Sequence, residues 1–311
     1  MEHRPAELRE RRAARTQRLR RRRRYGVLTA LVAVGAVVAA LVATRSSGGA
    51  PDPSPRVAAA SHVSISASRG SPQWGLETVA QVAAVRRLAA YGRPLFCGGT
   101  SKPMVALTFD DGPGVYTHFA IQKLRQNHLH ATFFLVGKEI HVWPGWAQRE
   151  RPYADFGDHT MTHPFLPALP EFQMVREIAG AQALIERTVG EPVVLFRPPY
   201  EGRSAAIDHE VTSLGMLQVL WNVDSRDSLG ANYAGIEQNV IAGLRAGSII
   251  LMHENRGQRI RALPTIVAAL ARRHLEAVTV PELVAEDPPS VGQLRAGGSG
   301  CGVLRQGGNG S

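Results

Sequence analysis

The chain has 311 residues, of which 44% are hydrophobic, and this is enough for one large folded domain or two small ones. Its formal net charge is +10, but the first 24 residues hold 11 Arg and 3 Glu and account for +8 of that charge. The nearly neutral remainder argues against a nucleic-acid-binding surface on the folded part, so we expect no nucleic-acid partner.

The first predicted element is an uncharged run of twenty residues, 25–44, which follows the basic arm of residues 1–24. A helix of this length spans about 30 Å, the thickness of the hydrocarbon core of a bilayer. A buried core helix or a cleaved signal peptide would also be apolar, but the run has no polar face and is longer than a usual signal-peptide core. We therefore expect a single-pass cell-membrane anchor with the arginines cytoplasmic and the rest of the chain extracellular, or else a secreted protein after signal cleavage.

The segments on either side of the central region read as connections. Residues 45–95 are rich in Ser, Gly, Pro and Ala and predict a linker, with a possible amphipathic helix over 76–91. Residues 286–311 predict a disordered tail. Cys97 and Cys301 could form a disulfide in an oxidising compartment or stay as free thiols, and the sequence leaves both open.

The central region, residues 96–285, alternates β-rich runs with helical stretches. The predicted strands are 104–109, 131–136, 193–196, 217–223, 248–253 and 277–280. The predicted helices are 118–126, 172–188, 204–214, 236–244 and 260–273. This alternation favours an α/β protein with a parallel sheet or barrel, whose active site lies at the carboxyl ends of the strands.

The first of these strands ends in a pair of carboxylates, Asp110 and Asp111, before a Gly-Pro turn. Successive side chains of a strand point in opposite directions, so one Asp could bind a metal while the other faces a water molecule. An Asp pair that only caps the next helix or builds the turn would give the same pattern.

Two histidines, His159 and His163, are four residues apart, which would place both imidazoles on one face of a helical turn. Together with an aspartate they would form a two-His, one-carboxylate site with an open position, which suits catalytic zinc. Non-haem iron oxygenases use the same ligand types, but the α/β alternation and the paired aspartates fit that class poorly.

Later strand ends carry further polar groups. Arg197, followed by two prolines and Tyr200, could pair with a carboxylate or could belong to a rigid loop. Asp227 follows the fourth predicted strand and His253 ends the fifth, and a neighbouring Asp would raise the pKa of His253 and keep it protonated as a general acid. This recurrence of polar residues at strand ends favours an enzyme.

Five short motifs occur in order: TFDDGP at 108–113, HTMTHP at 159–164, RPPY at 197–200, DSRD at 224–227 and LMH at 251–253. Together they resemble the motifs of the NodB-type polysaccharide deacetylases, carbohydrate esterase family 4, over roughly residues 97–283. The resemblance implies a distorted (β/α) barrel of about seven strands and a bound Zn²⁺ or another divalent ion such as Co²⁺.

The resemblance also implies residue roles. Asp110 would be the general base, oriented by Arg197, and His253 the general acid, tuned by Asp227. The implied metal ligands are Asp111, His159 and His163. The implied substrate contacts are the backbone N–H of Tyr200, Leu251 at the acetyl pocket, and Pro199.

The function that the resemblance implies is metal-dependent removal of acetyl groups from an N-acetylated cell-wall or chitin-like polysaccharide by a monomer. The same site could instead act as an O-acetyl xylan esterase. Glu201 and Ser228 stand where the family commonly has Gly and Trp, which motivates a third reading, an inactive membrane-tethered glycan-binding module. The complete set of base, acid and metal residues weighs against that third reading.

Overall fold

The computed structural model describes residues 73–74 and 77–301. The predicted basic arm and membrane anchor, residues 1–24 and 25–44, lie outside the described residues. Within the part that is described, every helix is too short or too polar to cross a membrane.

The sheet is a row of seven parallel strands in the order β7-β6-β5-β4-β3-β9-β8, with an eighth, β10, paired to the start of β3. Their bounds are β3 (Met104–Gly112), β4 (Ala131–Leu135), β5 (Ala154–Asp158), β6 (Leu195–Phe196), β7 (Leu217–Gln218), β8 (Val223–Asp224), β9 (Ile249–His253) and β10 (Glu276–Val278). Leu95 pairs with Val219 just beyond β7, and Cys97 pairs with Ser248 just before β9. This segment therefore links the two halves of the row, and the predicted barrel-like parallel sheet of about seven strands is confirmed.

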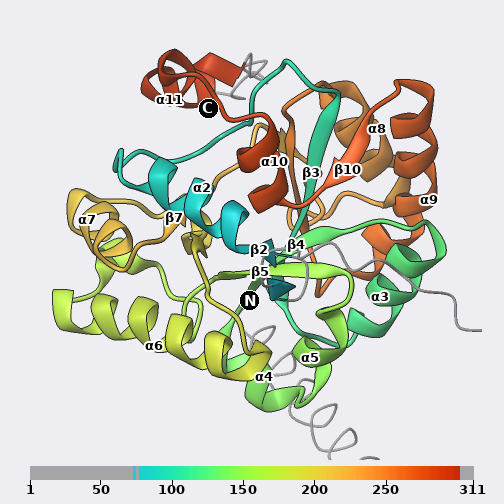
Figure 1. The fold of residues 1–311 in the computed structure, drawn as a ribbon. Helices are drawn as coiled ribbons and strands as arrows, with labels where there is room; N and C mark the ends of the chain where they lie inside the picture. Colours follow the sequence, from blue (N-terminus) through green and yellow to red (C-terminus); the bar gives the residue numbers. More distant parts are fainter. Residues whose placement is uncertain (1–72, 75–76, 302–311) are drawn as a thin grey trace, which may run out of the picture. The chain divides into compact units, whose positions relative to one another are not determined.

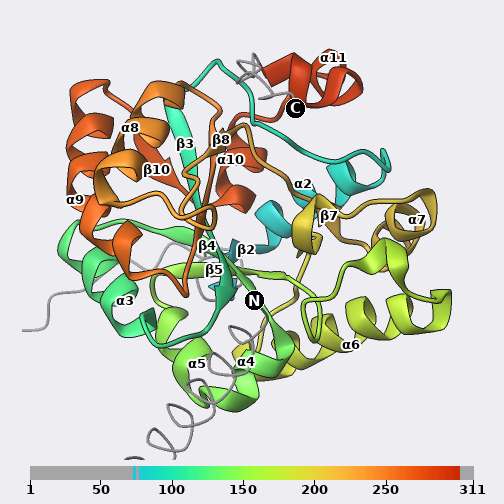
Figure 2. The ribbon, with the colours of Figure 1, turned by 180° about the vertical axis from the view of Figure 1, so that it is seen from behind.

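The helices are α2 (Val79–Ala89), α3 (Thr117–Gln126), α4 (Gly137–Val142), α5 (Trp146–Glu150), α6 (Glu171–Val189), α7 (Ala205–Ser213), α8 (Tyr233–Gly243), α9 (Gly257–Arg272), α10 (Val280–Glu286) and α11 (Val291–Ala296). Helices α3 to α9 lie around the strands, whereas α2 and α10 lie side by side across the middle of the view in Figure 1. Figure 2 shows the strands from behind. A separate antiparallel pair, β1 (Gln73–Trp74) and β2 (Glu77–Thr78), precedes α2.

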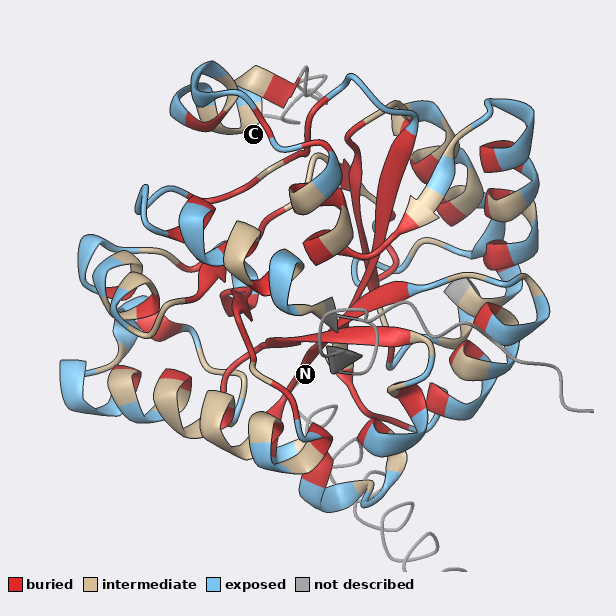
Figure 3. Ribbon diagram, in the orientation of Figure 1, coloured by how far each residue is buried: buried red, intermediate tan, exposed pale blue. Residues whose placement is uncertain are grey.

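Two apolar clusters follow from the alternation of side chains along β3. Val105, Leu107 and Phe109 belong to a cluster with the outer helices, while Ala106 belongs to a second cluster with α2 and α10. The strands are buried almost throughout (Figure 3). Thr108 and Asp110 continue the face of Ala106 toward the carboxyl end of β3, so the interior of the barrel changes from apolar to polar along its length.

The helix predicted over 76–91 forms as α2, which begins with a capping box at Thr78. Its Val82, Val85 and Leu88 are buried in the second cluster. The helix therefore belongs to the folded unit and not to the linker in which it was expected.

The expectation of a disordered tail is wrong for residues 286–301. Helix α11 begins with a capping box at Ser290, and a 3₁₀ helix, η3 (Gly297–Cys301), follows it. Of the two alternatives for the cysteines, the structure has the disulfide between Cys97 and Cys301. Gln293 and Arg245 also hold this segment, through hydrogen bonds to the carbonyls of Gly98 and Cys301. Residues 302–311 lie outside the described part.

Other differences concern the limits of elements. Strand β5 was not predicted, and the single strand predicted over 217–223 is two strands, β7 and β8. The strand predicted over 277–280 begins at Glu276, and Val280 is already the first residue of α10.

Candidate active site

The carboxyl end of β3 brings two adjacent carboxylates to one cavity. The pairing with β4 shifts register between Asp110 and Gly112, and Asp111 has a left-handed φ of 71°. Both aspartates line the same cavity as a result. The expectation that they point in opposite directions therefore fails here, because strand geometry is interrupted at Asp111.

His159 and His163 lie in the loop that follows β5, and not on the helical turn that their spacing predicted. Thr160 and His163 have φ values of 69° and 64°. The Thr160 N–H donates to Asp158 Oδ1 at 2.6 Å, and the His163 N–H donates to Thr160 Oγ1 at 3.0 Å. A tight loop fixed by these bonds places the imidazole centroids 4.9 Å apart.

Asp111, His159 and His163 converge. Asp111 Oδ1 lies 3.7 Å from His159 Nε2 and 3.2 Å from His163 Nε2, and one ligand atom from each residue falls within 4.8 Å of the other two. His159 Nδ1 lies 2.6 Å from the Arg197 carbonyl, which can only accept, so Nδ1 carries the proton and Nε2 presents a lone pair. This donor set fits a divalent ion of the zinc type.

The protonation states of the three candidate metal ligands also suit a bound cation. Burial, the largest cause, and the neighbouring His163 bring the pKa of His159 below its usual value, although Asp110 and Asp111 oppose the shift, and this favours the neutral imidazole that a metal requires. Burial tends to raise the pKa of Asp111, but the bond with His163 and the neighbouring histidines bring the net pKa below its usual value. Asn255 Nδ2 donates to Asp111 Oδ2 at 2.9 Å.

Arg197 lies beneath the cavity and is fully buried. Its Nη1 donates to Asp110 Oδ1 at 2.7 Å and to Thr108 Oγ1 at 2.8 Å. Its other donors reach the carbonyls of Val219 and Leu220. Burial lowers the pKa of Arg197 and Asp110 opposes that shift. The guanidinium therefore links Asp110 through hydrogen bonds to the two carbonyls that follow β7.

His253, at the end of β9, is the cross-strand neighbour of Asp110. Its Nδ1 lies 2.7 Å from Asp227 Oδ1, and its backbone N–H donates to Asp227 Oδ2 at 2.8 Å. Burial lowers the pKa of His253, but the hydrogen bond that it donates to Asp227 and the negative charges of Asp110, Asp227 and Asp111 together raise it above its usual value.

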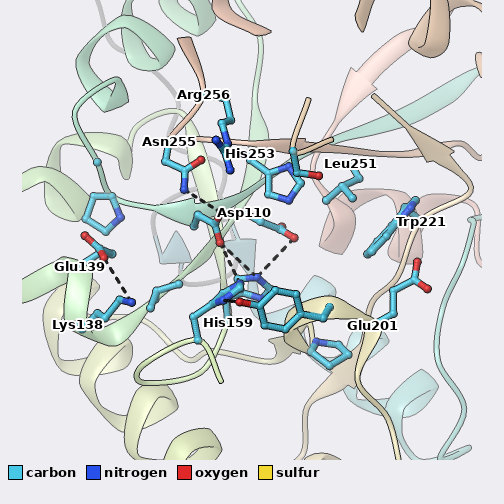
Figure 4. A pocket seen from close by; sticks show the side chains of 18 of the residues that line it. Asp110, Lys138, Glu139, His159, Glu201, Trp221, Leu251, His253, Asn255 and Arg256 are labelled. Atoms are coloured by element: carbon cyan, nitrogen blue, oxygen red, sulfur yellow. Dashed lines mark hydrogen bonds and ion pairs between the residues drawn. The ribbon is translucent and has the colours of Figure 1, made fainter. Parts of the chain in front are cut away.

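These groups border a cavity of about 770 Å³, part of which Figure 4 shows. Of the residues singled out from the sequence, those that line it are Asp110, Asp111, His159, His163, Tyr200, Leu251, His253, Glu201 and Ser228. Pro198 lines it in place of Pro199. In the close-up, Lys138 and Glu139 lie on one side of His159, and Trp221 and Glu201 on the other.

Several lining residues were not singled out from the sequence, namely Lys138, Trp143, Trp221, Asn255 and Arg256. Asn255 and Arg256 follow His253 by two and three residues, so their place after a strand end was an available signal. Lys138 belongs to α4, which was not predicted.

The comparisons with known proteins agree with the motifs. A family model for polysaccharide deacetylase matches residues 98–219. A peptidoglycan-N-acetylglucosamine deacetylase of Bacillus cereus is 33% identical over 189 residues, 57% of this chain and 69% of the relative. A chitooligosaccharide deacetylase of Sinorhizobium fredii is 32% identical over 199 residues, 59% of this chain and 93% of the relative.

A solved structure, that of the Bc1960 peptidoglycan N-acetylglucosamine deacetylase, superposes with a TM-score of 0.60 at 30% identity and covers 64% of this chain and 96% of its own. The resemblance in the motifs is thus confirmed by sequence over 57–59% of the chain and by fold over 64% of it. The chain belongs to the polysaccharide deacetylases, the NodB-type proteins of carbohydrate esterase family 4, and is a hydrolase.

Proposed function

We propose that this protein removes N-acetyl groups from peptidoglycan or a chitin-like glycan by metal-dependent hydrolysis. The observation that carries the proposal is the convergence of Asp111, His159 and His163 beside Asp110 and His253 in one cavity. The relatives are named for deacetylation of peptidoglycan and of chitooligosaccharides, which supports the same class of substrate here.

Asp111, His159 and His163 would hold the ion, with Zn²⁺ or Co²⁺ preferred by their mixed nitrogen and oxygen donors. When bound, a divalent ion acts as a Lewis acid toward the acetamide carbonyl. His159 is pre-oriented for this task by its bond to the Arg197 carbonyl, and the hydroxyl of Tyr200 lies 3.2 Å from His163 Nδ1.

Asp110 and His253 carry out the proton transfers. Asp110, held by Arg197, accepts the proton of the attacking water, and His253 donates a proton to the leaving nitrogen. Asp227 keeps His253 protonated for this step. The backbone N–H of Tyr200 would stabilise the oxyanion, and Leu251 would contact the acetyl methyl group. The products are acetate and a free amino sugar.

A location outside the cytoplasm is part of the proposal. The run 25–44 would anchor the chain, and the Cys97–Cys301 disulfide is typical of oxidising compartments. Deletion of residues 25–44 should move the protein from the membrane fraction to the soluble fraction of expressing cells. Equal distribution of the two proteins would contradict the anchor.

The test of the activity is acetate release by the full-length chain, with added Zn²⁺, from chitooligosaccharides, peptidoglycan and acetylxylan in parallel. We expect release from the first two, and Asp110→Asn should abolish turnover while retaining zinc binding. Release from acetylxylan alone would favour the esterase. Binding of glycan without any release would favour the binding module, for which Glu201 and Ser228 are the motivating residues.

A further inference from the structure

A second cavity of about 630 Å³ adjoins the active-site cavity. The two cavities share three lining residues, Glu201, Trp221 and Asp224. Trp221 and Glu201 stand together at one side of the active site in Figure 4. The second cavity therefore continues from the active site on that side, away from Lys138.

The lining of the second cavity has the two features that sugar rings require. Two half-buried aromatic side chains, Trp221 and Phe96, offer apolar surface for the C–H face of a pyranose. The carboxylates of Glu201 and Asp224 and the amide of Asn239 offer hydrogen-bonding groups for hydroxyls. Asn239 is held by a 3.0 Å bond from Nδ2 to the Ser225 carbonyl.

Phe96 and two residues of η3, Gly298 and Ser299, line the second cavity but not the active-site cavity, and we call them its far wall. All three lie outside the matched residues 98–219. A Cβ on Gly297 would lie 3.5 Å from the Phe96 ring, so η3 packs closely against that side chain. The disulfide at Cys301 and the Arg245 bond to the Cys301 carbonyl fix η3 in this place.

We propose that the second cavity is a glycan-binding site for the sugars that adjoin the reacting sugar in the same chain, and that the disulfide-held segment Gly297–Cys301 forms its far wall. This inference rests on the proposed function, because it takes the substrate to be a glycan chain whose sugars extend on either side of the reacting one. The ligand class is a chain of β-linked hexosamines, and the active-site cavity alone would hold its shortest members.

The test compares kcat/KM for penta-N-acetylchitopentaose with that for N,N′-diacetylchitobiose, using the full-length chain with Zn²⁺. We expect wild type to favour the pentamer. Phe96→Ala should lower the pentamer-to-dimer ratio about tenfold, mainly through KM, because the aromatic contact with the bound sugar is lost. Ala242→Trp, which fills the cavity from the exposed side of α8, should lower the ratio in the same way without depending on the fold around Phe96.

Phe172→Ala is the matched control, since Phe172 is exposed and lines neither cavity, and it should leave the ratio unchanged. Cys301→Ser removes the disulfide that holds η3 against the cavity, so it should also lower the pentamer-to-dimer ratio. An unchanged ratio in Phe96→Ala and Ala242→Trp would overturn the binding site, and an unchanged ratio in Cys301→Ser would overturn the role of the disulfide-held wall. Absence of acetate release by wild type from either oligomer would instead count against the proposed function.

Discussion

The amide of Asn255 holds the outer oxygen of Asp111: Nδ2 lies 2.9 Å from Oδ2, while Oδ1 of the same carboxylate faces His159 and His163. One oxygen is thus occupied by a hydrogen bond and the other is directed at the histidines. This is the arrangement expected of a residue that orients a metal ligand from behind.

Asn255→Ala should therefore weaken metal binding. Loss of such an outer contact typically reduces metal affinity by about 10–100-fold, and we expect a loss in that range for Zn²⁺. Competition with a chromogenic chelator on metal-free protein measures this directly. Asn127→Ala, which removes a comparable amide bond to the Lys123 carbonyl on α3, serves as the control. Equal affinities in the two variants would contradict the assignment.

The buried pair of Arg197 and Asp110 gives a second prediction, on stability. Arg197→Met leaves the Asp110 charge buried without its partner, and the free energy of unfolding should fall by about 3–5 kcal/mol. Adding Asp110→Asn removes the stranded charge, so the double variant should be more stable than Arg197→Met alone.

Urea unfolding followed by circular dichroism measures these differences. Arg203→Met is the matched control, because Arg203 and Asp208 form a half-exposed ion pair, and it should cost about 1 kcal/mol or less. A double variant that is less stable than Arg197→Met would show that the lost hydrogen bonds of Arg197, and not the unpaired charge, dominate.

The contrast between predicted and observed elements has a physical cause. Helix α6 follows a helical hydrophobic periodicity and β9 is a continuous apolar run, and both were predicted to within a few residues. Strand β5 was missed because its sequence, ADFGD, is polar. Gly157 is required there because a Cβ would meet the Phe134 ring at 2.4 Å, and this constraint is tertiary.

The active site also differs from what the sequence predicted. The metal, acid and base residues could be proposed from strand ends and motifs, but their arrangement could not. Asp111, Thr160, His163 and Tyr200 all have left-handed φ, which periodicity rules for helices and strands do not describe. The helical-turn interpretation of the two histidines failed for this reason.

The pH dependence of turnover should depend on Asp227. The pKa of His253 is raised, and its protonated form is the proposed acid, so kcat/KM should fall as pH rises through that pKa. Asp227→Asn removes a charge that raises the pKa and should move this alkaline limb to lower pH. Asp208→Asn, which changes a carboxylate paired with Arg203, should leave the limb in place.

The free energy of unfolding at different pH values tests whether the pKa of His253 is raised on folding. A raised folded pKa means that the His253–Asp227 pair stabilises fully below the unfolded His pKa of about 6.5 and that this contribution is lost as pH rises through the folded pKa. The stability difference between wild type and Asp227→Asn should therefore be larger at about pH 5.5 than at about pH 9. Equal differences at the two pH values would mean that the charge of His253 does not strengthen the pair in the folded protein.

Glu201 gives a prediction in which a glycine variant is more stable than an alanine variant. Its φ is 54°, directly after Tyr200 at 58°, so two consecutive residues with a Cβ adopt the left-handed region. Burial and the nearby charge of Asp224 also raise the pKa of the Glu201 carboxyl, so its ionised form is disfavoured. Glycine, common at this position in the family, has neither the Cβ nor the charge.

The left-handed conformation costs about 1–2 kcal/mol for a residue with a Cβ, and the greater freedom of glycine in the unfolded chain offsets about 0.4–1 kcal/mol of the gain. Glu201→Gly should therefore be more stable than Glu201→Ala by about 0.5–1 kcal/mol in urea unfolding. Both variants lack the carboxylate, so their difference isolates the backbone. In helix α7 the order should reverse, with Glu210→Gly less stable than Glu210→Ala by about 1 kcal/mol. If Glu201→Ala is at least as stable as Glu201→Gly, the chain does not require the left-handed conformation at position 201. The presence of Glu instead of Gly there would then have no backbone cost.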